Sequence, residues 1–293
     1  MARASPRPHT LAPALTRILC VAAHPDDIEF TIAGSVAKWV REGRLVVFCL
    51  VTSGGAGTNE HTPSSAGLVP VRERESADAA KILGVKDLVF LGYQDGVLEP
   101  TLGLRRDLTR VIRRSRPDVV VCGDPTVRWY GNEYLNHPDH RAVASAVLDA
   151  VFPSAETRAV FPELLTEGLE PHHVKEVLLT GAVPPDTWID VGDTLALKCA
   201  ALRAHVSQVG SGDWVDKLLQ GWAARDGKRA GVLVRRGLPP LRVAKRDVVP
   251  APSAVRRSGY RSPRRPAPGA PAPRPRRSSR TSPGCRCRAP LRR

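Results

Sequence analysis

The chain has 293 residues, enough to bury a core in one large domain or two small ones. No apolar run approaches the roughly 20 residues of a membrane helix, so we expect no membrane partner. The formal net charge of +15 would suggest a nucleic-acid partner, but residues 241–293 hold 16 of the 44 basic residues and one of the 29 acids. Subtraction leaves 28 residues of each sign in residues 1–240, so the body of the protein is formally neutral.

The chain begins with a Pro-, Ala- and Arg-rich stretch, residues 1–15, that we expect to be a loose leader. The apolar stretch after it ends at Val21-Ala22-Ala23, which resembles the end of a secretory signal. Arg17 interrupts this stretch, however, and cleavage there would remove what reads as the first core strand. We therefore expect a cytoplasmic protein, in keeping with six cysteines that form no CxxC pair.

Short apolar runs alternate with segments of helical spacing over the next two hundred residues. The runs typical of buried strands are 18–23, 45–51, 87–91, 118–122 and 174–180. The segments typical of helices are 32–41, 72–83, 104–114, 138–151 and 193–209. A polar, glycine-rich loop covers about 52–70, and it is long enough to be functional. This alternation predicts an α/β domain with a mainly parallel sheet, whose site lies in loops at the carboxyl ends of the strands.

The composition changes near residue 234, and the pattern predicts a single catalytic domain over 16–235 followed by a tail. Residues 236–293 are rich in Arg, Pro and Ser, with almost no aliphatic periodicity, which is typical of disorder. Such a tail is either a flexible arm, a frameshifted reading of GC-rich DNA, or a basic arm that binds nucleic acid.

Two short segments combine imidazole and carboxylate groups at the exits of predicted strands. Ala23-His24-Pro25-Asp26-Asp27 follows the first strand, and His137-Pro138-Asp139-His140 begins a helix after another. Each segment taken singly has an ordinary structural explanation. His24 could be a hydrogen-bonded loop histidine, and the HPDH segment could be the start of a helix that begins with proline. Together, they favour a metal site over those explanations.

A catalytic zinc site needs three N or O ligands, an open position for water, and a carboxylate that is not a ligand. His24, Asp27 and His140 are suitable ligands, and Asp26 is a suitable base. Adjacent carboxylates in a turn point in different directions, so the two aspartates need not both face the metal. His137 and His140 lie on one side of a helix start, so one can bind metal while the other donates a hydrogen bond to the substrate.

Six segments in this order resemble the PIG-L/LmbE-like family of zinc-dependent N-acetylglucosaminyl deacetylases. The resemblance extends from about residue 17 to residue 209, and it implies a Rossmann-like α/β fold that hydrolyses N-acyl groups of amino-sugar conjugates. The matching segments are AHPDDIEF (23–30), TSGGAGTNE (52–60), VRERESADAAKILGV (71–85), FLGYQDG (90–96), NHPDHRA (136–142) and KCAALRAHVSQ (198–208).

The resemblance also implies roles for single residues. His24, Asp27 and His140 match the zinc ligands of the family, Asp26 its general base, and His137 the residue that stabilises the oxyanion or donates a proton. Whether Fe²⁺ replaces Zn²⁺ in the cell is left open.

Residues outside the metal segments match less firmly. Arg72 and Asp95 match positions that bind sugar hydroxyls in related enzymes. The alternatives are an exposed helix charge beside Glu75 for Arg72, and a turn residue before Gly96 for Asp95. Some relatives carry a tyrosine two residues before the first histidine of HPDH, where this chain has Leu135.

The sequence therefore predicts a zinc-dependent hydrolase that removes an acyl group, expected to be acetyl, from an N-acetylglucosamine-type conjugate. A second reading is an amidase that cleaves a thiol conjugate of an amino-sugar pseudodisaccharide with the same catalytic centre. A third is a nucleic-acid-binding protein that uses the basic tail. The oligomeric state is not predicted.

Overall fold

A computed structural model describes residues 9–59, 65–132, 134–230 and 241–247. Its main sheet has the strand order β3-β2-β1-β4-β7-β9-β8, and a two-stranded hairpin, β5-β6, stands apart from it. The strands of the main sheet are β1 (Arg17–Ala22), β2 (Leu45–Thr52), β3 (Asp87–Tyr93), β4 (Val119–Gly123), β7 (Glu176–Thr180), β8 (Thr187–Ile189) and β9 (Leu241–Asp247). The hairpin consists of β5 (Trp129–Tyr130) and β6 (Tyr134–Leu135).

Five neighbouring strands of the main sheet are parallel, as the sequence predicts. β1 lies between β2 and β4, with Ile18 opposite both Val46 and Val119. Parallel pairing of β3 with β2 and of β7 with β4 extends the sheet on both sides. The carboxyl ends of the five strands therefore share one edge of the sheet, where loops from distant parts of the chain meet.

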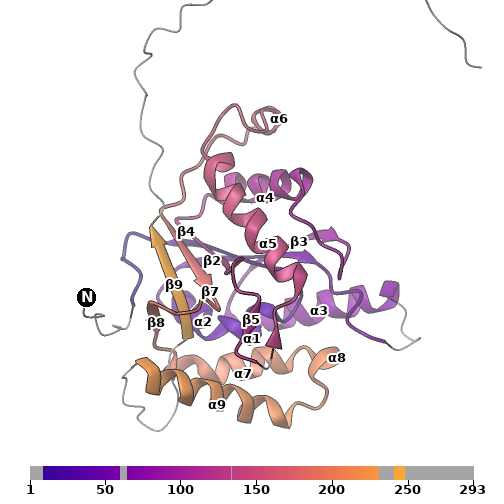
Figure 1. The fold of residues 1–293 in the computed structure, drawn as a ribbon, viewed down its shortest axis with the longest axis vertical. Coiled ribbons are helices and arrows are strands. Elements are labelled where there is room, and N and C mark those ends of the chain that lie inside the picture. The colour runs from indigo at the N-terminus through magenta and orange to yellow at the C-terminus, as the bar shows by residue number, and fades with distance from the viewer. Residues whose placement is uncertain (1–8, 60–64, 133, 231–240, 248–293) are drawn as a thin grey trace, which may run out of the picture. The chain divides into compact units, whose positions relative to one another are not determined.

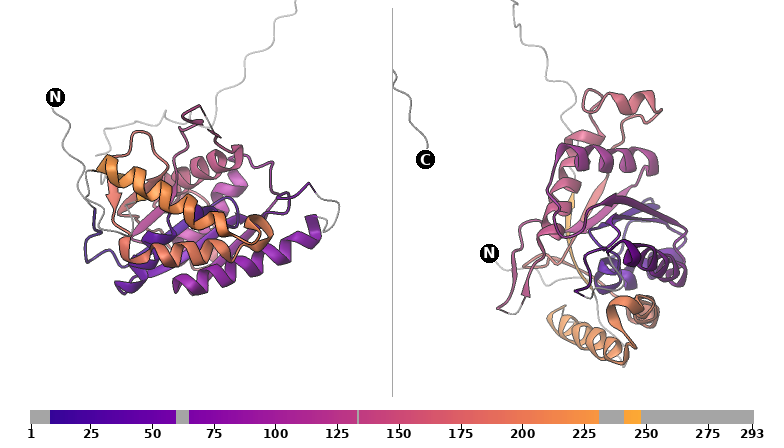
Figure 2. Two further views of the ribbon diagram at one scale, coloured as in Figure 1. Left: turned by 90° about the horizontal axis from the view of Figure 1, so that it is seen from below. Right: turned by 90° about the vertical axis from the view of Figure 1, so that its right-hand side faces the viewer.

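Helices cover both faces of the sheet (Figures 1 and 2). One core packs the sheet against α2, α3 and α7, and a second packs it against α4 and α5. Alternate residues of β1 enter different cores: Ile18 and Cys20 enter the first, and Leu19 and Val21 the second. A third, smaller cluster joins α7 to α9. The helices are α1 (Asp27–Thr31), α2 (Ala33–Arg41), α3 (Ser65–Leu83), α4 (Leu102–Ser115), α5 (Pro138–Asp149), α6 (Glu163–Thr166), α7 (Leu195–Arg203), α8 (Val206–Val209) and α9 (Asp213–Ala230).

Local signals explain several helix starts. Pro138 occupies the first turn of α5, where its missing backbone N–H costs no hydrogen bond, because the first N–H groups of a helix have no partner within the helix. The side chain of His137 accepts a hydrogen bond from the backbone N–H of Asp139 at 3.2 Å. The hydroxyl of Thr101 caps α4 by accepting the N–H of Leu104. These caps fix where each helix leaves the sheet edge.

The structure departs from the predicted elements at some boundaries. The predicted loop over 52–70 is too long, because α3 already begins at Ser65 and contains Pro70. The single helix predicted over 193–209 is wrong, because α7 ends at Arg203 and a separate α8 follows. α5 itself ends at Asp149, and the helical segment Ala150–Ala155 that follows it is interrupted at Phe152, whose backbone is extended.

β9 also changes the predicted domain boundary. Sequence analysis placed residues 236–293 in a tail outside the domain, yet β9 pairs antiparallel with both β7 and β8. The boundary at residue 235 is therefore too early, and residues 241–247 belong to the sheet. The rest of the predicted tail and residues 1–8 of the predicted leader lie outside the described residues.

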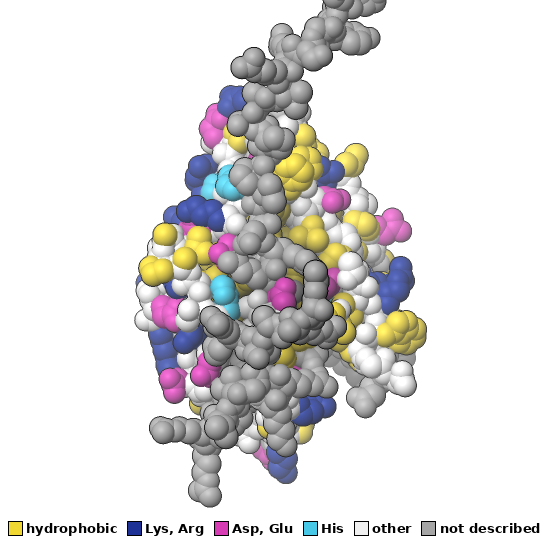
Figure 3. Space-filling model, turned by 60° about the vertical axis from the view of Figure 1, so that its left-hand side comes forward, with side chains coloured by type: hydrophobic (Ala, Val, Ile, Leu, Met, Phe, Trp, Pro, Cys, Tyr) yellow, Lys and Arg dark blue, Asp and Glu magenta, His cyan; other side chains and the backbone are white. Residues whose placement is uncertain are grey.

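Charged side chains of both signs are interspersed on the face shown in Figure 3, as the equal numbers of acids and bases in residues 1–240 lead one to expect. Among the described residues, no helix is both long enough and apolar enough to cross a bilayer.

Candidate metal centre

The carboxyl edge of the sheet brings together every residue that the sequence singled out. His24, Asp26 and Asp27 follow β1, where Asp27 begins α1, and Asp95 follows β3. His137 and His140 stand at the start of α5, and Arg72 reaches the edge from α3. Segments more than a hundred residues apart in the sequence thus form one cluster.

Three side chains present ligand atoms to a common point. Suitable atoms of His24, Asp27 and His140 all lie within 4.8 Å of one another. Asp27 is central, because its Oδ2 lies 3.4 Å from Nδ1 of His24 and its Oδ1 lies 3.0 Å from Nε2 of His140. Two imidazoles and one carboxylate are the N/O donor set that suits zinc.

The other nitrogen of each histidine ring faces an oxygen. Nε2 of His24 lies 3.0 Å from Asp95 Oδ1 and 3.3 Å from Asp139 Oδ2, and Nδ1 of His140 lies 3.1 Å from Asn136 Oδ1. Histidines that bind metal commonly donate their second N–H in this way, which fixes the ring and its tautomer. The surroundings of both rings therefore fit a metal bound through Nδ1 of His24 and Nε2 of His140.

A second group of atoms, from His24, His137 and Asp139, is equally close together. Asp139, however, is fully buried, and its two oxygens accept the backbone N–H groups of Gly96 and Leu98. These hydrogen bonds hold the carboxylate in place, with Oδ2 also 3.3 Å from Nε2 of His24. Asp139 is thereby placed to orient the ring of His24.

The two ion-paired ligands have strongly shifted pKa values. Burial opposes the charge of His24, but hydrogen bonds to Asp27 and Asp95 outweigh it and raise the pKa of His24 to about 10. Burial also opposes ionisation of Asp27, but the neighbouring His140 and His24 hold its pKa well below the usual range. Asp27 is therefore an anion that can neutralise part of the charge of a cation.

Asp26 lies beside the ligands in a strained conformation. Its backbone has φ of 88°, in the left-handed region that non-glycine residues seldom adopt. Nη2 of Arg72 lies 3.2 Å from Asp26 Oδ2 and donates a hydrogen bond to the carbonyl of Pro25 at 2.6 Å. Burial and the charge of Asp27 raise the pKa of Asp26 to about 7, against the opposing effect of Arg72.

Arg72 is only 3% exposed, so its alternative interpretation as an exposed helix charge is wrong. Nη1 donates to the carbonyl of Gly54, and a Cβ added at Gly57 would approach that nitrogen to 2.6 Å. The glycine-rich loop after β2 therefore packs directly on the guanidinium group. Asp95, expected to bind sugar hydroxyls, uses its Oδ2 to accept the N–H of Ala56.

His137 is the most accessible of the three histidines, with 40% of its side chain exposed. Its ring centroid lies 4.9 Å from that of His24 and 5.4 Å from that of His140. Nδ1 accepts the N–H of Asp139, so a neutral ring carries its proton on Nε2. Burial and the charge of His24 lower the pKa of His137, which favours this neutral donor form.

Sequence reasoning missed the residues that support the ligands. Asn136 and Asp139 belong to the NHPDH segment, but Asp139 reads there as a helix-start residue, and its contact with Gly96 depends on tertiary structure. His205, in the late family segment KCAALRAHVSQ, is fully buried, with Nε2 3.4 Å from Glu29 Oε2.

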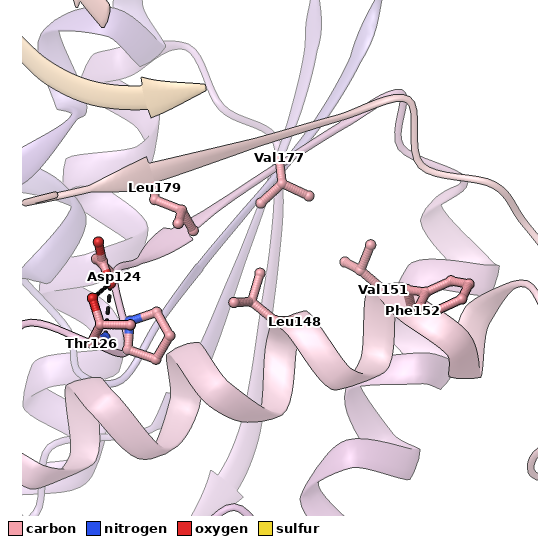
Figure 4. A pocket seen from close by; sticks show the side chains of 8 residues that line it. Asp124, Thr126, Leu148, Val151, Phe152, Val177 and Leu179 are labelled. Carbon is pink, nitrogen blue, oxygen red and sulfur yellow. Dashed lines mark hydrogen bonds between the residues drawn. The ribbon is translucent and has the colours of Figure 1, made fainter. Parts of the chain in front are cut away.

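Two cavities lie near this edge. A small one, of about 100 Å³, is lined by Asp27, His140 and Tyr130 among others. A larger one, of about 360 Å³, lies between the end of α5 and β7, where apolar side chains such as Leu148 and Val177 point toward one another (Figure 4). The larger cavity contains none of the predicted catalytic residues.

Comparison with known proteins points to one family. The family profile described as GlcNAc-PI de-N-acetylase (PIG-L) matches residues 19–151. A diacetylchitobiose deacetylase of Thermococcus kodakarensis is 32% identical over 198 residues, covering 68% of this chain and 72% of that protein. A 1D-myo-inositol 2-acetamido-2-deoxy-alpha-D-glucopyranoside deacetylase of Streptomyces scabiei is 34% identical over 256 residues, covering 66% of this chain and 76% of the relative.

A solved structure shares the fold. The N,N'-diacetylchitobiose deacetylase of Pyrococcus horikoshii, solved with an inhibitor, superposes with a TM-score of 0.71 and 28% sequence identity. The match covers 79% of this chain and 84% of that one.

Proposed function

Because this chain belongs to the PIG-L family of N-acetylglucosaminyl deacetylases, we propose that it uses zinc to remove the acetyl group from an N-acetylglucosamine-type conjugate. As a member of this family, it is a hydrolase of amide C–N bonds. The proposal concerns the metal, the base and the substrate.

One observation carries the proposal. His24, Asp27 and His140 present a zinc-type donor set, and a carboxylate outside that set, Asp26, follows the same strand. A binding protein would need no such base. The relatives' names, which refer to glucosamine derivatives, favour an amino sugar as the substrate.

Each residue then has a distinct task. When bound, zinc supplies Lewis acidity, which lowers the pKa of water toward neutrality and polarises the amide carbonyl. Asp26 accepts the proton of the attacking water. His137 donates from Nε2 to the carbonyl oxygen as negative charge develops there. The leaving nitrogen takes up the proton that Asp26 has accepted as the C–N bond breaks, and the products are acetate and a free amino sugar.

The assignment of Arg72 and Asp95 to sugar hydroxyls stays a prediction. Both side chains already make contacts inside the protein, Arg72 with Asp26 and Asp95 with His24. Kinetics of the Arg72 variant described in the Discussion test the first of these assignments.

The direct test is an assay of the purified, zinc-loaded full chain against N-acetylglucosamine, N,N'-diacetylchitobiose and an N-acetylglucosaminyl inositol, with detection of free amine. We expect amine release that a chelator abolishes. His140→Ala should lose its metal, because two protein ligands seldom hold zinc firmly. Full metal occupancy in that variant would contradict the ligand assignment, and metal analysis of the wild-type protein would distinguish Zn²⁺ from Fe²⁺.

The amidase reading shares this centre and is tested in the same assay. An amide of a thiol-conjugated amino-sugar pseudodisaccharide is added as a fourth substrate, and its hydrolysis in preference to the acetamides would favour the amidase. A salt-dependent shift of DNA by the full chain, lost on removal of residues 251–293, would support the nucleic-acid reading.

A further inference from the structure

The β5-β6 hairpin carries aromatic side chains next to the metal centre. It ends at Leu135, immediately before the NHPDH segment. Trp129 lies opposite Leu135 in the hairpin, and Tyr130 lies opposite Tyr134. Because side chains alternate along a strand, the two tyrosines share one face and Trp129 and Leu135 share the other.

Tyr130, on the tyrosine face, borders a cavity that two of the candidate ligands also line. Tyr130 lines the cavity of about 100 Å³ together with Asp27 and His140. Its hydroxyl lies against Gly181, whose φ of 70° and missing Cβ leave room for this approach. The ring centroids of Tyr130 and Tyr134 are 6.0 Å apart, so the second tyrosine continues the surface outward from the first.

Tyr134 stands at the rim of the site. Its side chain is a large aromatic group that is 51% exposed, although burial of the remainder and the carboxylates of Asp27 and Asp26 raise the pKa of its hydroxyl. The hydroxyl therefore senses the charges of the Asp26 and Asp27 carboxylates, while much of the residue remains accessible. Such a position suits contact with a part of the substrate that does not react.

Size shows why a second contact is needed. The cavity beside the ligands is about 100 Å³, below the roughly 300–1,000 Å³ of ordinary ligand pockets. A whole saccharide therefore does not fit inside it, and a bound sugar has to extend along the rim. A tyrosine offers a sugar both an apolar ring for its C–H groups and a hydroxyl for its polar groups.

We propose that the Tyr130–Tyr134 face of the hairpin is a saccharide subsite, which binds the sugar unit adjacent to the N-acetylglucosamine that is deacetylated. The subsite rests on the proposed function, because the metal centre defines which sugar reacts. It makes a β-linked disaccharide or longer oligosaccharide a better substrate than the monosaccharide.

The test compares three variants of the full, zinc-loaded chain on N-acetylglucosamine and on N,N'-diacetylchitobiose. Tyr134→Ala should lower the ratio of kcat/KM for the disaccharide to that for the monosaccharide by up to about tenfold, since an aromatic contact contributes up to about 1.5 kcal/mol. Tyr134→Phe, which keeps the ring, should lose less. Trp129→Ala is the matched control, because Trp129 is 63% exposed on the opposite face of the same hairpin, and it should keep the wild-type ratio.

Two results would overturn the subsite: an unchanged ratio in Tyr134→Ala, or an equal fall in Trp129→Ala. Melting temperatures and metal content identify a variant that has lost its fold. Calorimetric binding of N,N'-diacetylchitobiose to the same proteins separates this proposal from the proposed function. If the wild-type protein hydrolyses neither sugar but Tyr134→Ala alone weakens disaccharide binding, the subsite stands and the deacetylase assignment fails.

Discussion

At the scale of single residues, the proposed centre assigns the binding of a metal and the transfer of a proton to different carboxylates. Asp26 and Asp27 are neighbours in the sequence, yet one contacts Arg72 and the other contacts two histidines. The left-handed backbone at Asp26 turns the chain between them. Two adjacent carboxylates can thereby serve different functions.

Asp26→Asn tests this separation. Asparagine is nearly isosteric with aspartate, so His24 and Asp27 should still bind zinc at wild-type stoichiometry. An amide cannot accept a proton from water, and loss of a general base typically lowers the rate by about 10²–10⁴. We expect the loss mainly in kcat, measured alongside metal content. Loss of the metal from this variant would show that Asp26 is a ligand and would make Asp27 the candidate base. A near-normal rate would show that Asp26 is not the base and would make His137 the next candidate.

Arg72→Lys distinguishes support of Asp26 from binding of a sugar. Lysine keeps the charge but cannot reach Asp26, the Pro25 carbonyl and the Gly54 carbonyl together as the guanidinium group does. If Arg72 holds Asp26, kcat should fall about 10- to 100-fold with little change in KM, because buried charged hydrogen bonds contribute about 1.5–3 kcal/mol. A rise in KM alone would show that Arg72 binds substrate, as the family resemblance implies. Thermal melting and metal content serve as controls for folding.

At the scale of elements, β9 and Lys198 join parts of the fold that the sequence left separate. β9 covers the outer edge of β7 with antiparallel pairing. Lys198, on α7, donates hydrogen bonds from Nζ to the carbonyls of Phe30 and Thr31 at the end of α1. α1 begins at the ligand Asp27, so α7 supports the helix that holds part of the centre.

Truncation separates β9 from the segment after it. A chain that ends at residue 240 lacks β9 and exposes the edge of β7, so its melting temperature should fall by several degrees relative to the full chain. A chain that ends at residue 250 keeps β9 and should melt as the full chain does, with the same activity. Differential scanning calorimetry of the three proteins measures these melting temperatures. Equal melting of all three would return the domain boundary to residue 235.

Lys198 predicts a dependence of stability on pH. Burial, the largest cause, lowers its pKa to about 8 from an ordinary value of 10.5, although nearby acids oppose the shift. Between these two pH values the unfolded chain binds the proton of this lysine more readily than the folded protein does. The cost of burying Lys198 therefore falls as pH rises, and the free energy of unfolding increases. The free energy of unfolding of the wild-type protein, minus that of Lys198→Met, should therefore increase from pH 8 to pH 10.5 and be constant below about pH 7. A difference that is flat across the upper range would contradict the shifted pKa.

The sequence predicted the parallel strands well because a strand that is buried on both faces of the sheet is apolar along most of its length, as Leu45–Thr52 is. It predicted the cluster of His24, Asp27 and His140 because parallel strands end at one edge. It missed β9 because three of its seven residues are basic and it lies next to an Arg- and Pro-rich segment, and because its pairing with β7 is a long-range contact. Asp139 and Asn136 were missed for a similar reason, since their partners lie across the fold or depend on the final ring orientation.

At the scale of the whole molecule, the described part combines one main sheet, two principal cores and a candidate metal centre at the carboxyl edge. The 28 acids and 28 bases of residues 1–240 balance, so the excess charge lies beyond the described helices. A neutral sugar needs no strong electrostatic attraction, which agrees with a balanced surface. On the proposed function, specificity then depends on contacts at the rim, and Tyr134 is the contact that we propose.

The position of the ligands in the chain has a consequence for biosynthesis. His24 and Asp27 leave the ribosome long before His140, and the three meet only when β1 and β4 have paired and α5 has docked. On the proposed function, a metal bound there stabilises the finished domain by mass action rather than the early nascent chain. A cell short of that metal would then contain less of this protein, because metal-free copies unfold and are degraded more often.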